Sequence, residues 1–120
     1  MLRIPADCCF DHLAQQVPDV GAAVAWYRQT FVDCRVLYQD ETWAFVEVAG
    51  AKLAFIRQGD HPDHIGWRVS QQQLDEVAAA CGQSIRTHRD QTRSIYLPAP
   101  GDRWIELIAY PPEYPAPASS

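Results

Sequence analysis

An internal duplication limits the possible architectures of this chain more than any other feature. The segments Asp11–Val17 and Asp63–Val69 both read Asp-His-aliphatic, then three variable residues, then Val, and a polar helix start follows each. The same shift of 52 positions relates two further pairs of segments, Trp43–Phe45 to Ile95–Leu97 and Leu53–Ile56 to Ile105–Ile108. Each copy is too short to bury its own apolar face, so we expect the two copies to share a core.

Each copy has the pattern of a βαβββ module. In the first copy, strands are predicted over Cys9–Val17, Cys34–Gln39, Thr42–Val48 and Ala51–Arg57, with a helix after Asp19. In the second copy, strands are predicted over Asp63–Ser70, Ile85–Arg89, Arg93–Leu97 and Trp104–Tyr110, with a helix between Ser70 and Gly82 and a turn at Pro98–Gly101. Asp19 and Ser70 suit helix starts because their side-chain oxygens accept from unpaired backbone amides, and Gly82 suits a helix end.

The predicted fold class is α+β. Two tandem modules, about residues 9–57 and 63–110, are expected to form an eight-stranded, U-shaped, open, barrel-like mixed sheet with the helices on its outer face. We assign residues 1–110 to a single domain, since domains commonly run to about 100–200 residues. Residues 111–120 are Pro-rich and are expected to form a flexible tail.

Charge and composition exclude several classes of partner. Fifteen acidic residues outnumber ten basic ones, whereas nucleic-acid-binding modules usually show a basic face, so no nucleic-acid partner is expected. No apolar run approaches the roughly 20 residues that span a bilayer, so no membrane partner is expected either. The first ten residues lack the apolar core of a signal peptide. We therefore expect a cytoplasmic protein with reduced thiols at Cys8, Cys9, Cys34 and Cys81.

Three polar residues mark the candidate site. Side chains alternate across a strand, and this alternation predicts His12, His64 and Glu106 on one concave face of the sheet. The histidines hold equivalent places in the duplication, whereas Glu106 is matched by Ala54. A buried carboxylate needs a partner or a cation. Two imidazoles and one carboxylate form a facial ligand set that leaves metal positions open. The alternative, that the histidines are structural, stays open.

Further polar residues are weaker candidates. Positive charge is concentrated around the last three predicted strands, at Arg86, Arg89, Arg93 and Arg103. Arginine suits bidentate binding of a carboxylate or phosphonate, although solvated strand edges explain this charge equally well. Arg68 shares a strand face with His64 and is a candidate for substrate binding. His88 is a candidate general base because the usual pKa of histidine is near neutrality. A surface histidine is the alternative.

The complete pattern resembles the vicinal oxygen chelate superfamily, which includes glyoxalase I, fosfomycin-resistance proteins, methylmalonyl-CoA epimerase, extradiol dioxygenases and bleomycin-resistance proteins. The resemblance rests on His in the first strand of each module and on Ile-Glu-Leu at Ile105–Leu107. Val-Pro-Asp-Val and Ala-Trp-Tyr within residues 17–27 are similar to the family's first strand–helix junction. Ala99–Arg103 matches the family's Asp-Pro-Asp-Gly-Asn turn imperfectly. The resemblance covers Phe10 to Tyr110.

The resemblance implies roles for individual residues. His12, His64 and Glu106 would bind one divalent ion, which could be Fe, Mn, Zn, Ni or Co, and Glu106, Tyr96 and His88 would be catalytic. The implied substrate contacts are Ser94 and Tyr96, to which we add the candidates Arg86 and Arg68. Glyoxalase I has a fourth, glutamate ligand where this chain has Ala54, which argues against an ordinary glyoxalase I.

The function implied is that of a small metal-dependent enzyme. It would chelate vicinal oxygens of a small-molecule substrate, with lyase, isomerase, thiol transferase or dioxygenase chemistry. The alternative is a non-catalytic small-molecule or antibiotic-binding protein of the bleomycin-resistance type, although such proteins generally lack the three metal ligands. The resemblance also implies a homodimer, and apolar residues such as Trp43 and Phe45 would need such cover.

Overall fold

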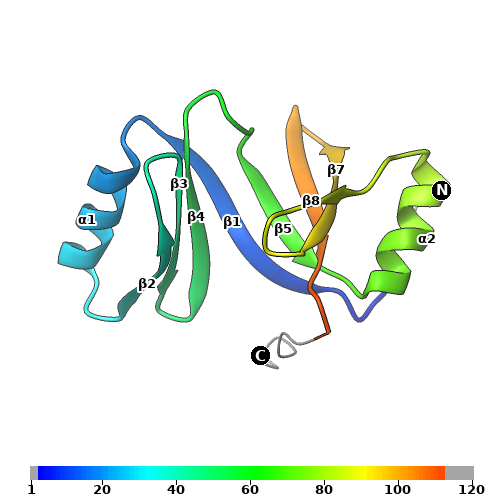
Figure 1. Ribbon diagram of the computed structural model, residues 1–120, viewed down its shortest axis with the longest axis horizontal. Helices are drawn as coiled ribbons and strands as arrows, with labels where there is room; N and C mark the ends of the chain where they lie inside the picture. The colour runs from blue at the N-terminus through cyan, green and yellow to red at the C-terminus, as the bar shows by residue number, and fades with distance from the viewer. Residues whose placement is uncertain (1–2, 113–120) are drawn as a thin grey trace. The chain divides into compact units, whose positions relative to one another are not determined.

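A computed structural model describes residues 3–112 of the chain, and within this range it contains eight strands and two helices. In chain order they are β1 (Cys9–Val17), α1 (Val20–Thr30), β2 (Cys34–Gln39), β3 (Trp43–Val48), β4 (Ala51–Arg57), β5 (His64–Arg68), α2 (Gln71–Cys81), β6 (Arg86–Thr87), β7 (Arg93–Ala99) and β8 (Arg103–Ala109) (Figure 1). The hydrogen-bonded strand order is β2-β3-β4-β1-β5-β8-β7-β6. β1 and β4 are parallel, whereas β2–β3, β3–β4, β6–β7 and β7–β8 are antiparallel. The predicted α+β class is confirmed, with an open mixed sheet that does not close into a barrel.

Internal contacts divide the chain into two compact units. One is His12–Ile65, and the other combines the described parts of Met1–Asp11 and Gly66–Ser120, so the boundaries fall within β1 and β5. The assignment of residues 1–110 to one domain stays a prediction. Most of the predicted Pro-rich tail, residues 113–120, lies outside the described residues. Between residues 3 and 112, no helix is both long enough and apolar enough to cross a membrane.

In the unit His12–Ile65, α1 covers one face of strands β2 to β4 (Figure 1). Asp19 caps the helix as predicted, accepting from the backbone N–H of Ala22 at 2.9 Å. Helical spacing puts the buried Val20 and Val24 on the side of α1 that faces the strands. They pack in a core with Ala44, Val46, Val48 and Phe55. The side chains on the other face of these strands therefore point away from α1.

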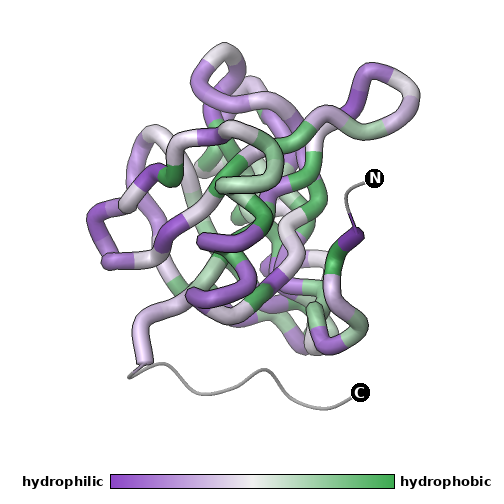
Figure 2. Tube along the Cα trace, turned by 90° about the vertical axis from the view of Figure 1, so that its right-hand side faces the viewer, coloured by the Kyte–Doolittle hydropathy of each residue, from purple (hydrophilic) through white to green (hydrophobic). Residues whose placement is uncertain are grey.

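In the second unit, α2 packs on β7 and β8. Ser70 forms a capping box with Gln73, and Gly82 ends the helix with a left-handed φ of 67°, as predicted from the sequence. The core of this unit consists of Val69, Leu74, Val77, Ala78, Ile95, Leu97, Leu107 and Ala109. Figure 2 shows the same pattern along the chain, with hydrophilic residues concentrated on projecting loops and hydrophobic ones where strands and helices pack.

The predicted strand Ile85–Arg89 is wrong in extent, since β6 contains only Arg86 and Thr87. A tight turn begins at His88, whose backbone N–H donates to the carbonyl of Thr92 at 2.8 Å. The Asp90 carboxylate accepts from both the amide and the hydroxyl of Thr92, which is the local bonding for which aspartate is favoured in turns. At the remaining strand ends the differences are largest for β7, which continues to Ala99 beyond the predicted Leu97, and for β5, which ends at Arg68 before the predicted Ser70; the other ends differ by one residue at most.

Candidate metal centre

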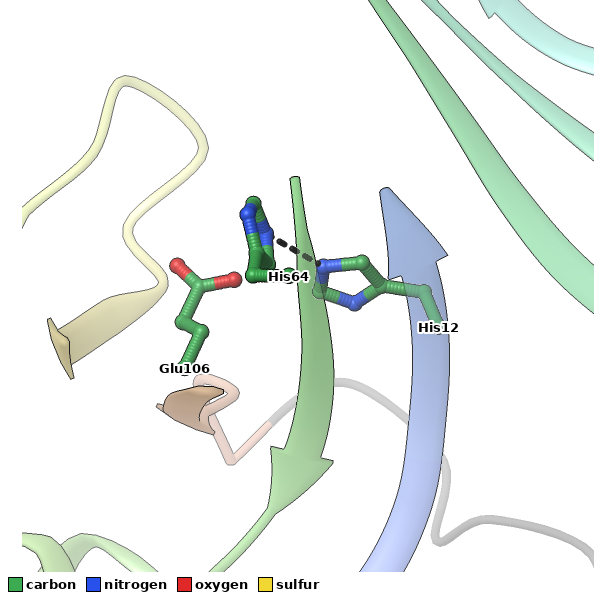
Figure 3. A group of neighbouring side chains, drawn as sticks. All are labelled: His12, His64 and Glu106. Carbon is green, nitrogen blue, oxygen red and sulfur yellow. Dashed lines mark hydrogen bonds between the residues drawn. The ribbon is translucent and has the colours of Figure 1, made fainter. Parts of the chain in front are cut away.

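The two histidines of the duplication face each other. His12 lies on β1 and His64 at the start of β5, and both are buried, at 6% and 5% exposure. Their Nε2 atoms are 3.3 Å apart (Figure 3). The Nδ1 of His64 lies 2.9 Å from the carbonyl oxygen of Pro62. Because a carbonyl only accepts, this Nδ1 carries the proton and the Nε2 of His64 presents a lone pair toward His12.

Ring packing fixes the orientation of this pair. The two imidazoles meet edge to face, with centroids 5.3 Å apart and an interplanar angle of 85°. His12 also meets the ring of Phe45 edge to face, at 5.9 Å. These ring contacts, together with the hydrogen bond to the Pro62 carbonyl, hold the two imidazoles with their Nε2 atoms 3.3 Å apart.

Glu106, on β8, is buried at 4% exposure and has polar neighbours in its own unit. The cross-strand partner of Glu106 is Tyr96 on β7. Burial, the charge of Glu106 and a hydrogen bond to Glu106 raise the pKa of Tyr96 well above its usual value, so its phenol stays protonated and donates. The Nε2 of His88 lies 3.8 Å from Oε2 of Glu106 and 2.8 Å from the hydroxyl oxygen of Ser94.

The ligand atoms of His12, His64 and Glu106 all lie within 4.8 Å of one another (Figure 3). Two nitrogen ligands at about 2.0–2.1 Å from one metal, in tetrahedral or octahedral geometry, are about 2.8–3.4 Å apart. The observed separation of 3.3 Å between the two Nε2 atoms fits this range. Two neutral imidazoles and one carboxylate suit zinc and non-haem iron sites. The residues present therefore fit a divalent metal ion.

The predicted substrate-binding residues lie in different surroundings. Ser94 is fully buried, and its hydroxyl forms a hydrogen bond with the His88 ring. Ser94 can therefore influence the site through the orientation of His88. Arg86 is exposed on β6, and its charge opposes the rise in the pKa of Tyr96. The Arg68 guanidinium lies over the ring of Tyr110, 4.2 Å from its centroid. Arg93 donates to Gln71 and Asp75 of α2, so its charge is used in packing that helix.

Two polar residues of this region were missed by the sequence reasoning. Asp11 is buried at 7% exposure and accepts from the hydroxyl of Tyr110 at 2.8 Å. Asp11 and His12 are consecutive in β1 and both buried, which regular alternation does not produce. The repeated Asp-His pair was the available signal. In the other copy, the Asp63 carboxylate accepts from the backbone N–H of Gln16 at 2.7 Å, so both aspartates have bonding roles.

A shallow hollow of about 580 Å³ lies elsewhere in the unit His12–Ile65. It adjoins the start of α1, and its lining residues are Pro18, Asp19, Val20, Gly21, Gln39, Asp40, Glu41 and Arg57. None of these is a predicted ligand or catalytic residue.

Comparisons with known proteins identify the fold. No protein-family model and no curated protein matches the sequence. A hypothetical protein from Bacillus halodurans has a similar structure, with a TM-score of 0.68 and 13% identity over 92% of this chain and 99% of that one. A glyoxalase/bleomycin resistance protein/dioxygenase superfamily member from Vibrio splendidus gives a TM-score of 0.58 and 10% identity, covering 82% of this chain and 95% of that one.

A variant of homoprotocatechuate 2,3-dioxygenase from B. fuscum is also similar, with a TM-score of 0.66 and 16% identity over 88% of this chain. This chain spans 36% of that dioxygenase chain. At these identities the likeness concerns the fold. The chain has the fold of the vicinal oxygen chelate superfamily, as its resemblance implied.

Proposed function

We propose that this chain is a metal-dependent enzyme of the vicinal oxygen chelate type. His12, His64 and Glu106 would hold one divalent ion, and a small substrate would bind through two adjacent oxygen atoms. The observation that carries this proposal is the convergence of one ring nitrogen from each histidine and one Glu106 carboxylate oxygen, all within 4.8 Å of one another. Three protein ligands leave positions for substrate, as catalytic sites require and closed structural sites do not.

The chain's own residues divide the remaining tasks. When bound, a divalent ion supplies Lewis acidity that stabilises negative charge on the substrate oxygens. Tyr96 donates to Glu106 and so fixes the orientation of this ligand. His88 lies 2.8 Å from the Ser94 hydroxyl oxygen and is exposed on about a third of its side chain, and in this proposal it would exchange a proton with the substrate. Lyase, isomerase, thiol transferase and dioxygenase chemistry would all be compatible with such an ion, and the name of the B. fuscum neighbour adds support for the last.

Metal binding is the direct test. We expect protein purified without added metal or a polyhistidine tag to contain close to one transition-metal ion per chain by elemental analysis. After chelation, calorimetric titration with Zn²⁺, Mn²⁺ and Fe²⁺ should show one site. His64→Ala and Glu106→Gln should weaken it by about 100-fold or more, because losing even an outer-shell partner costs about 10–100-fold.

His61→Ala is the matched control, because this histidine is exposed and precedes β5. It should bind metal like the parent. If the parent binds no metal, or if all these variants bind it equally, the three residues are not ligands. A parent that binds small apolar compounds equally well with and without metal would instead support the non-catalytic binding protein.

A further inference from the structure

The edge strand β2 contains a bulge that turns one aromatic ring to the other face of the sheet. Val36 packs with the core beneath α1, and regular alternation would put Tyr38, two residues later, on that same face. The register of β2 against β3 shifts between these residues, so that Tyr38 becomes the cross-strand partner of Phe45. Phe45 lies on the face away from α1, because Ala44 and Val46 on either side of it pack beneath the helix. Bulges re-aim side chains in this way at functional places in a sheet.

Three rings meet on this face, and we call them the aromatic platform: Tyr38, Trp43 and Phe45. Tyr38 stacks on Trp43 with centroids 4.8 Å apart and an interplanar angle of 30°, and Trp43 meets Phe45 at 6.0 Å. Tyr38 and Trp43 are 42% and 37% exposed. Aromatic residues are enriched in surfaces that bind another protein, so the platform is a candidate interface.

The turn between β2 and β3 fixes the platform in place. The Asp40 carboxylate accepts from the Tyr38 hydroxyl, from the backbone N–H of Thr42 at 2.7 Å and from that of Trp43 at 3.0 Å. The hydrogen bond from Tyr38, followed by those from Thr42 and Trp43, holds the pKa of Asp40 well below its usual value, so the carboxylate stays charged and keeps these donors. A surface whose side chains are ordered in advance loses little entropy on binding.

The C-terminal segment of the chain has the chemistry of a ligand for such a surface. Residues 111–120 read Pro-Pro-Glu-Tyr-Pro-Ala-Pro-Ala-Ser-Ser, and the described part of the chain ends at the exposed Pro112. In a polyproline II helix, which has three residues per turn, Pro112 and Pro115 would share one side and Tyr114 and Pro117 another. Pro-rich segments in this conformation dock on grooves lined by aromatic rings, because their conformation is formed before binding. The eight residues beyond Pro112 would extend about 25 Å.

We propose that the C-terminal segment of one copy docks on the aromatic platform of a second copy, with its proline rings packed against Tyr38 and Trp43. A reciprocal exchange uses each segment and each platform once, so the assembly closes at two copies. The contact is apolar and not electrostatic, since the only charges of the segment are Glu113 and the terminal carboxylate, in a chain of net charge −5. Because it does not involve metal binding, this contact stands or falls separately from the proposed function.

Indole NMR signals test the contact, because the chain has four tryptophans and each gives its own N–H signal. The receptor is the ¹⁵N-labelled full chain with Pro115→Ser and Pro117→Ser, which keeps the platform. The donor is the unlabelled full chain with Trp43→Leu, which keeps the segment. Adding the donor should move the Trp43 signal of the receptor and leave the other three in place. An unlabelled chain with both serine substitutions should move none of them.

Peptide binding measures the strength of the contact. A fluorescent peptide of residues 111–120 should bind the receptor chain in anisotropy titrations. Tyr38→Leu or Trp43→Leu in that chain should weaken binding by about tenfold or more, since aromatic anchors dominate interfaces, whereas Trp43→Phe keeps a ring and should lose less. Trp26→Leu is the matched control and should not affect binding, because Trp26 is 55% exposed but lies on α1, which covers the other face. Raising NaCl from about 50 to 500 mM should not weaken binding either.

No movement of the Trp43 signal on adding the donor, no peptide binding, or equal weakening by Trp26→Leu and Trp43→Leu would overturn the proposal. A parent chain that light scattering finds monomeric at the concentration of the NMR sample would also overturn it, because the segment would then not join two copies. Urea unfolding of the leucine variants separates lost binding from a folding defect. If Trp43→Leu does not fold, the peptide replaces it as the donor to the labelled receptor.

Discussion

Ala54 is the residue at which the two halves of the duplication differ most in chemistry, since its mate is Glu106. The duplication therefore predicts that the side chain at position 54 points toward the metal from the other half. The structure shows Ala54 at 6% exposure, paired with Phe45 on β3 and beside Ala14 on β1. The surroundings are apolar because Ala54 packs in a cluster with Ala14 and Ile56, and Phe45 packs against this cluster. Added bulk at position 54 will therefore be poorly tolerated.

The variant Ala54→Glu should couple metal binding to stability. Without metal, we expect a loss of about 1–3 kcal/mol in the free energy of unfolding, because the new side chain overpacks a buried cluster and carries a charge. With metal, the carboxylate can act as a fourth ligand, so metal affinity should be kept or increased. Binding of a small compound with vicinal oxygens, such as catechol, should fall because one open position is occupied. Urea unfolding with and without Zn²⁺ measures both effects.

Ala54→Gln is the control for bulk, since it has the same shape without the charge. It should lose similar stability and recover less of it on adding metal. If metal restores both variants equally, or neither, then position 54 does not reach the metal.

Tyr110 provides a pH-dependent prediction. Burial, the charge of Asp11 and the hydrogen bond to Asp11 raise the pKa of Tyr110 well above its usual value, with the charge of Arg68 opposing. In the unfolded chain this pKa is about 10. A pKa raised by folding contributes stability that is present below about pH 10 and is lost as the pH rises above it.

The variant Tyr110→Phe should therefore have two effects. At neutral pH the free energy of unfolding should fall by about 1.5–3 kcal/mol, because a donor to the buried Asp11 carboxylate is lost. Above about pH 10, its stability should decline less steeply than that of the parent. Urea titrations between about pH 7 and pH 11 measure both. Parallel curves for parent and variant would show that the phenol does not titrate with unfolding.

At the scale of elements, local chemistry decided where prediction succeeded. The predicted bounds of β1, β2 and β4 and the capping residues of both helices agree with the structure, because short-range rules of alternation and capping set them. The predicted end of β7 is wrong, since the strand continues through Pro98 to Ala99. Proline is tolerated there because β6 pairs only with Arg93 and Ser94, which leaves β7 without that neighbour at Pro98.

The capping box of α2 gives a prediction for an element. The Ser70 hydroxyl accepts from the amide of Gln73 at 3.1 Å, and the Gln73 side chain accepts from the amide of Ser70 at 2.9 Å. Ser70→Ala should lower the free energy of unfolding by about 1 kcal/mol, whereas Ser70→Thr should change it little. Urea unfolding with an unchanged m-value checks this. Equal stability of Ser70→Ala and the parent would show that the box contributes nothing.

At the scale of the whole molecule, long-range contacts were the part that the sequence could not supply. The duplication predicted the three candidate ligands because it relates distant residues directly. The duplication does not relate Asp11 to Tyr110, which lie 99 positions apart and form a hydrogen bond. It also does not relate His88 to Ser94, the residue to which the His88 ring is hydrogen-bonded. The expected homodimer stays a prediction. Exposed aromatic residues such as Trp26, Phe31 and Trp43 are consistent with it, and light scattering would measure it.

Metal binding should stabilise the entire chain, because the proposed ligands are 52 and 42 positions apart in the sequence and converge only on folding. A ligand that binds only the folded state adds about 2.7 kcal/mol at 100 times its Kd, which corresponds to a Tm increase of roughly 10–20 °C for a chain near 100 residues. Thermal unfolding followed by circular dichroism should show the Tm rising with Zn²⁺ concentration and returning on chelation.

Glu106→Gln should largely abolish the shift, while His61→Ala should preserve it. The shift should also shrink below about pH 6, where protons compete for the imidazoles. An identical shift in the parent and in Glu106→Gln would place the bound metal elsewhere on the chain.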